Sequence, residues 1–199
     1  AACSAASAGM GTITGDNLTR ALSAFFNQDE QQIRKVTEVE KTIDFLSKSI
    51  TDYLITIRGA EIPDEHLKQL GKLHHVIIDM ERIGDRAENI AEYTEALIDA
   101  REKMTPQGLS ELRDVSDKTL LLFDKSLDIF KNRDVTLFDE IRKMKKEVDS
   151  KLTEYTDNHI GRLQEEMCSP HTGVVFTNML ASLERIASHS LTIAFSVEP

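Results

Sequence analysis

Residues that break helices are rare in this chain, and the clearest breaks form three short clusters. The 199 residues include 9 Gly and 4 Pro, and both types occur together at 59–63, 105–108 and 169–173. Between them run long stretches rich in Leu, Ala, Glu, Lys and Ile, a composition that favours helix, and no stretch alternates as a strand would. We therefore predict an all-α protein with six long helices joined by short loops, over residues 3–26, 29–58, 64–103, 110–131, 135–167 and 174–196.

The second half of the chain repeats features of the first half. Glu81-Arg82-Ile83, near the end of the third predicted helix, recurs as Glu184-Arg185-Ile186 near the end of the sixth. The second and fifth predicted helices also align, with Asp44 matching Asp149. A lone three-helix unit would leave an apolar flank exposed, so we expect two such units to pack side by side. The predicted organisation is one compact domain made of two tandem three-helix repeats, 1–103 and 104–199.

Composition excludes several classes of function. The net charge is −10 and the sequence pI is about 5.1, which argues against nucleic-acid binding and against docking on anionic lipid headgroups. No apolar run is long enough to insert into a bilayer. Two cysteines are too few for a disulfide framework and indicate a reducing compartment. The chain begins with Ala rather than Met, and we expect it to be a fragment of a longer protein.

An acidic stripe runs along the third predicted helix. Glu81, Asp85, Glu88 and Glu92 fall on one face at about 100° per residue, and His74 joins this face two turns earlier. The stripe borders the apolar face of the helix rather than opposing it. Because like charges at these spacings repel, something must compensate them.

A bound cation would compensate this charge. Glu40 and Asp44, one turn apart on the second predicted helix, could face the stripe in an antiparallel pair. Carboxylates from facing helices build metal sites in bundle proteins, and carboxylates with a histidine suit iron, manganese or zinc. The plainer alternative is a solvated acidic face with ordinary ion pairs from Arg82 and Arg86. The predicted metal ligands are Glu40, Asp44, His74, Glu81, Asp85 and Glu88.

No motif of enzymatic catalysis occurs in the sequence, so we expect a protein that is not an enzyme. A phosphate-binding P-loop, a dinucleotide-binding glycine motif and a nucleophile elbow are all missing. A di-iron carboxylate oxidase would need Glu-x-x-His pairs on two helices, and Glu-x-x-His does not occur.

The motif Glu81-Arg-Ile-Gly-Asp85, extended by Ala-Glu-Asn-Ile-Ala-Glu and echoed one repeat later, resembles the PhoU family. This resemblance implies a six-helix bundle that binds multinuclear clusters of iron or another metal, and a regulatory role in phosphate uptake. The segment 10–29 looks more like the PhoU regions at the C-terminus of sodium/phosphate cotransporters. That likeness implies a cytoplasmic tail at the inner face of the membrane, with a transporter domain of the same or another chain as partner. A homodimer stays open.

The second repeat departs from the family pattern. Ser188 stands where the first repeat has Asp85, and Lys145 stands where it has Glu40. An ammonium group and a hydroxyl in place of two carboxylates would weaken cation binding. We therefore expect one competent metal site in the first repeat and a degenerate one at Asp149, Glu184 and Ser188.

A metal-free scaffold is the alternative from a different functional class. Three-helix units of this length also occur in spectrin-like repeats, which hold distance and bind partners. Gly84 argues against that alternative, because a glycine inside a helix costs about 1 kcal/mol relative to Ala. Close approach of a neighbouring helix beside a metal would give a reason to keep it.

Overall fold

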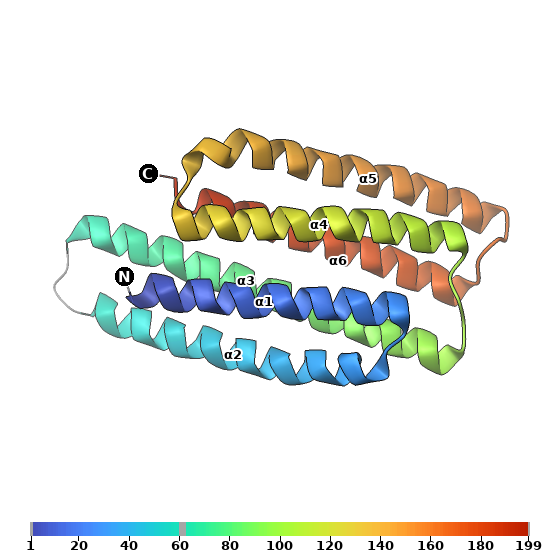
Figure 1. Cartoon of the computed structure of the whole chain (residues 1–199), viewed down its shortest axis with the longest axis horizontal. Coiled ribbons are helices and arrows are strands. Elements are labelled where there is room, and N and C mark those ends of the chain that lie inside the picture. Colours follow the sequence, from blue (N-terminus) through green and yellow to red (C-terminus); the bar gives the residue numbers. More distant parts are fainter. Residues whose placement is uncertain (1, 60–62, 199) are drawn as a thin grey trace.

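The computed structural model describes residues 2–59 and 63–198, and within them the chain is all-helical, as predicted. Figure 1 shows α1–α3 packed beside α4–α6, with all the long helices nearly parallel or antiparallel. A short 3₁₀ helix, Val135–Leu137, precedes α5. The long helices are α1 (Ala2–Asn27), α2 (Glu30–Arg58), α3 (Asp64–Ala100), α4 (Pro106–Asn132), α5 (Phe138–Gln164) and α6 (Pro170–Phe195).

Two helices begin four residues earlier than predicted. Each has a proline as its first residue, Pro106 in α4 and Pro170 in α6. Proline fits this position because its missing N–H would have no partner there. The residue before each proline caps the helix: the side chain of Thr105 accepts a hydrogen bond from the Gly108 N–H, and that of Ser169 accepts one from the Thr172 N–H. These two clusters therefore start helices as well as separate them.

The other boundaries lie close to the predicted ones. At the predicted polar break before α2, Asp29 accepts hydrogen bonds from the N–H groups of the second and third residues that follow it. Helix α3 ends at Ala100 rather than 103, because Arg101 adopts a left-handed backbone with φ of 55°. Helix α5 ends at 164 rather than 167. Of the predicted break at 59–63, residues 60–62 lie outside the described part of the chain.

The two groups of three helices share one continuous hydrophobic core and meet at a central interface. Helix α1 packs on α2 and α3, α4 packs on α5 and α6, and the contacts α3–α6 and α1–α4 join the two groups. Gly15 of α1 allows close approach at this interface, since a Cβ there would lie 2.7 Å from Cε1 of Phe123 on α4. Within the described residues, no helix is both long and apolar enough to cross a membrane.

A buried polar contact also crosses the central interface. Nδ1 of His189 on α6 lies 2.8 Å from Oδ1 of Asp79 on α3, and Asp79 is buried. This contact ties the helix that carries the acidic stripe to its counterpart in the other half of the bundle.

Candidate metal centre

Three of the predicted ligands come together between α2 and α3. Glu40 and Asp44 lie one turn apart on α2, and Asp85 lies on α3. One carboxylate oxygen from each residue falls within 4.8 Å of the other two. Hard cations bind protein oxygens at about 2.0–2.6 Å, so two oxygens on one ion are separated by at most about 5 Å. The spacing therefore suits a single shared cation.

The carboxylate of Glu40 is the buried member of this group. Only 2% of the Glu40 surface is exposed, and neither carboxylate oxygen has a hydrogen-bond partner among the described residues. A Cβ at Gly84 would lie 2.7 Å from one of these oxygens and 2.8 Å from the other. The carboxylate thus occupies the space that any larger residue at position 84 would need. An unpartnered buried carboxylate is costly, and buried charges are ordinarily paired or bound to a metal.

Burial and mutual repulsion both act on the charges of this site. Burial, and then repulsion by Asp44 and Asp85, raises the pKa of Glu40 to about 8. The pKa of Asp85 is also raised, first by burial and second by the negative charges of Glu81 and Asp44. The pKa of Glu88 is raised in the same way, by burial and by the charge of Glu92. A cation bound among these groups would favour their ionised forms.

The remaining predicted ligands lie around this group rather than in it. Glu81 lies one turn before Asp85 on α3 and accepts a hydrogen bond of 2.9 Å from the Ser47 hydroxyl. Glu88 follows Asp85 by about one turn and is half-buried. His74 is two turns before Glu81, and no nitrogen of its ring belongs to the group. The structure therefore places Glu40, Asp44 and Asp85 at the centre and Glu81 and Glu88 on its flanks.

The ion pairs that the plainer alternative gave to Arg82 and Arg86 do not form among the described residues. Arg86 donates instead to Oδ1 of Asn89, at 3.3 Å, and Arg82 makes no ion pair within 4.0 Å. The acidic stripe is therefore not neutralised by direct ion pairs with these arginines, although the charges of Arg86 and Arg82 act to lower the pKa of Asp85.

The aligned residues of the second repeat have protein partners. Nζ of Lys145 lies 2.6 Å from Oδ1 of Asp149, and the Ser188 hydroxyl donates to Oε1 of Glu184 at 3.0 Å. The side chains of Asp149 and Glu184 are each 49% exposed. Among the described residues, no group of three possible ligands gathers here. The lysine supplies the positive charge that a cation would supply in the first repeat.

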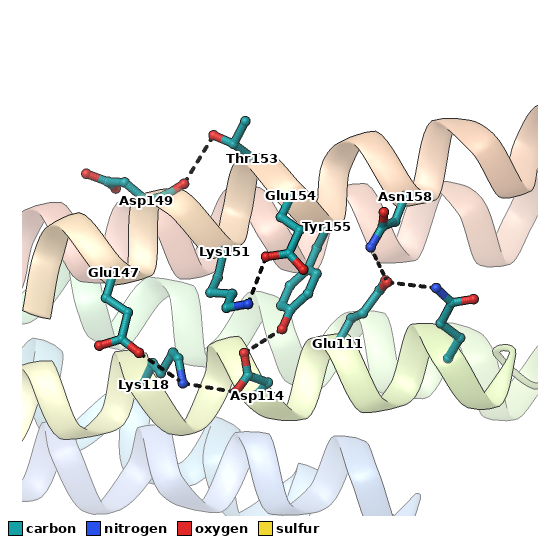
Figure 2. A network of polar contacts seen from close by, with 11 residues as sticks. Glu111, Asp114, Lys118, Glu147, Asp149, Lys151, Thr153, Glu154, Tyr155 and Asn158 are labelled. Atoms are coloured by element: carbon teal, nitrogen blue, oxygen red, sulfur yellow. Dashed lines mark hydrogen bonds and ion pairs between the residues drawn. The ribbon is translucent and has the colours of Figure 1, made fainter.

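Carboxylates between α4 and α5 also have protein partners, in the polar network shown in Figure 2. Lys118 of α4 lies between Asp114 and Glu147, at 3.0 and 3.3 Å. The Tyr155 hydroxyl donates to the other oxygen of Asp114 at 2.5 Å. These contacts lower the pKa of Asp114, against the effect of burial. Asp114 and Glu147 are thus partnered by a lysine or a tyrosine hydroxyl, whereas Glu40 has no such partner among the described residues.

Sequence reasoning missed a buried ion pair at the end of this network. Nη2 of Arg162 on α5 lies 2.8 Å from Oε2 of Glu111 on α4, and both side chains are buried. The other oxygen of Glu111 accepts hydrogen bonds from Asn158 and Gln107. The available signal was position: Glu111 precedes the buried residues Leu112 and Val115 on the inner face of α4.

Comparisons with known proteins agree with this architecture. The chain matches the PhoU domain over residues 8–94 and 112–197. It is 25% identical over 186 residues to a phosphate-specific transport system accessory protein PhoU homolog of Pseudomonas putida, spanning 93% of this chain and 72% of that protein. It is 28% identical over 183 residues to the phosphate-specific transport system accessory protein PhoU homolog 1 of Thermotoga maritima. This alignment spans 89% of this chain and 76% of that protein.

Solved structures share the fold. The crystal structure of PhoU from Pseudomonas aeruginosa superposes with a TM-score of 0.91 at 23% identity, covering 98% of this chain and 93% of that one. The phosphate transport system regulatory protein PhoU from Streptococcus pneumoniae gives 0.86 at 16% identity, covering 98% and 91%. At these identities the likeness establishes the six-helix fold with its two three-helix repeats.

Proposed function

The chain belongs to the PhoU family, and from that premise we propose that it regulates phosphate transport through a metal ion bound between α2 and α3. The observation that carries the metal proposal is the Glu40 carboxylate. It is buried against Gly84, has no hydrogen-bond partner in the part of the chain that the structure describes, and lies beside Asp44 and Asp85. Regulation by contact needs no catalytic group, so the proposed role is not enzymatic.

Glu40, Asp44 and Asp85 would hold the ion, with Glu81 and Glu88 as neighbouring oxygen donors for a further ion. Iron is the metal that we propose, with manganese or zinc as the alternatives. The ion would supply positive charge that the protein lacks at this point. The residues themselves would then keep α2 fixed against α3, because both helices would share the ligands of one ion. A ligand that binds only the folded arrangement stabilises that arrangement.

The partner that we propose is a component of the phosphate transport system, contacted at the inner face of the membrane. The relatives reported above are named as accessory proteins of the phosphate-specific transport system, and these names favour that system. The regulatory tail of a sodium/phosphate cotransporter is the second candidate, supported by the likeness of segment 10–29 to such tails. Both candidates use the same site and differ in the transporter that is regulated.

Loss of the metal site should abolish regulation in cells. In a strain of its own host that lacks the chromosomal copy, the wild-type gene should restore repression of a phosphate-responsive reporter by high phosphate. With the variant Asp44→Ala/Asp85→Ala, reporter expression at high phosphate should stay close to that of the strain without the gene, because two of the three central ligands are gone. The matched control Asp149→Ala/Glu154→Ala removes two half-exposed carboxylates from the second repeat and should behave as wild type. Equal repression by both double variants would contradict the proposal.

A further inference from the structure

A groove between α5 and α6 is a separate feature of the second repeat. Its volume is about 380 Å³. Leu152 and Thr156 line it from α5, and Leu180 and Ala181 line it from α6. Both leucines are more than nine-tenths buried, so they form a floor, while Ala181 is exposed.

Exposed apolar side chains continue this floor toward the α5–α6 turn. Ile160, one turn beyond Thr156, is 48% exposed, and Val174, one turn before Thr177 of the groove, is 59% exposed. Leu163 is 42% exposed and lies beside α6, since a Cβ at Gly173 would be 3.0 Å from its Cδ2. Contiguous exposed apolar surface of this kind marks binding sites for proteins or ligands.

The rim of the groove is acidic. Asp157 of α5 and Glu184 of α6 line it, and its lining residues include no Lys or Arg. Asp157 makes no side-chain hydrogen bond or ion pair in the described part of the chain. Glu184 accepts a hydrogen bond from Ser188, and Nε of Arg185 is 4.0 Å away, at the outer limit of an ion pair. An occupant with basic groups at its edges would complement this rim.

The repeat alignment places the groove beside the counterparts of the central metal ligands rather than over them. Those counterparts are Lys145, Asp149 and Ser188, and none of them lines the groove. Of the groove residues, only Glu184 aligns with the acidic stripe, at Glu81. The groove is therefore a feature distinct from the degenerate metal position.

We propose that the α5–α6 groove binds a basic amphipathic helix of a partner protein. The apolar side chains of that helix would cover Leu180, Ala181 and the exposed Ile160 and Val174, and its Lys or Arg side chains would meet Asp157 and Glu184. A second copy of this chain is a poorer occupant, because two chains of net charge −10 repel each other. The groove deepens the regulatory role proposed above, since it supplies a contact through which a transport component can be recognised.

A peptide-binding measurement tests this inference directly. The probe is a fluorescent amphipathic peptide of Leu and Lys, about 18 residues or five helical turns long, and its matched control has Glu in place of Lys. We expect the Leu/Lys peptide to bind the wild-type protein. Ala181→Lys, which places bulk and positive charge in the groove at an exposed position, should weaken binding by at least about tenfold.

Leu121→Lys serves as the matched variant. Leu121 is 61% exposed on α4 and does not line the groove, so a lysine at this position adds the same positive charge elsewhere on the surface. This variant should bind the Leu/Lys peptide within about twofold of wild type. Equal binding by wild type and Ala181→Lys, no binding of the Leu/Lys peptide, or equal binding of the Leu/Glu peptide would each overturn the inference. So would a wild-type dimer, seen by sedimentation, that Ala181→Lys dissociates. The measurement is made in chelator, so its outcome is independent of whether the first repeat binds metal.

Discussion

Replacing Glu40 with Gln should stabilise the metal-free protein at alkaline pH by about 3–5 kcal/mol. The pKa of Glu40 rises from its usual value of 4.5 to about 8 in the folded protein. Between these two values the unfolded chain releases the proton while the folded chain keeps it. The wild-type free energy of unfolding therefore falls as pH increases from about 4.5 to about 8. Glutamine resembles the protonated carboxyl in size and does not ionise, so the variant escapes this loss.

Urea unfolding in the presence of chelator, at about pH 5 and about pH 9, measures this difference. Near pH 5 the two proteins should differ by no more than about 1 kcal/mol, and the gap should widen as pH rises. Glu38→Gln is the control, since Glu38 is an exposed residue of the same helix. A gap between wild type and Glu40→Gln that stays constant across this range would show that Glu40 is ionised in the metal-free protein.

Replacing Gly84 with Ala should weaken metal binding without lowering the stability of the metal-free protein. The new Cβ would lie within 3 Å of both carboxylate oxygens of Glu40, so this carboxylate must leave its present position beside Asp44 and Asp85. Metal affinity should fall by at least about 10–100-fold, the loss typical when a ligand loses its support. The metal-free protein should not lose stability, because Ala is favoured over Gly in helices by about 1 kcal/mol and the displaced group is the flexible end of a side chain.

Gly71→Ala provides the control for this effect. Gly71 lies on the same helix, and a Cβ there would meet nothing within 4 Å. Titration calorimetry of the chelator-stripped protein should show unchanged metal affinity in Gly71→Ala, while thermal unfolding should show a gain from helix propensity. If Gly84→Ala bound metal as tightly as Gly71→Ala, Glu40 would not be a ligand.

The helices and their repeat followed from sequence because both are local or periodic features. Scarce breakers delimit helices, and Glu81-Arg82-Ile83 recurs with its spacing intact. The errors at α4 and α6 arose where a proline was interpreted only as a break, although Pro106 and Pro170 each begin a helix behind a capping residue. Propensity alone does not distinguish these two roles of proline, and the capping contact does.

The candidate site was predictable in composition and not in arrangement. Helical spacing put Asp85 and Glu88 on one face, but it could not tell that Glu40 points at Gly84 across the interface of α2 and α3. Helical spacing also could not show that His74 lies outside the group formed by Glu40, Asp44 and Asp85. Which residues of α3 face Glu40 depends on how far α2 and α3 are shifted along each other, and the sequence does not give that shift. The Glu111–Arg162 pair was missed for a related reason: its partners lie on different helices, far apart in sequence.

The metal content of the purified protein tests the central claim most directly. Protein prepared without chelator or affinity metal is analysed by elemental mass spectrometry, beside Asp44→Ala/Asp85→Ala and Asp149→Ala/Glu184→Ala. We predict stoichiometric iron, manganese or zinc in the wild type and in the second-repeat variant, and its loss from the first-repeat variant. Absence of metal from all three proteins, even after anaerobic addition of Fe(II), would contradict the claim. So would metal lost equally from both variants, because the second repeat would then also hold it.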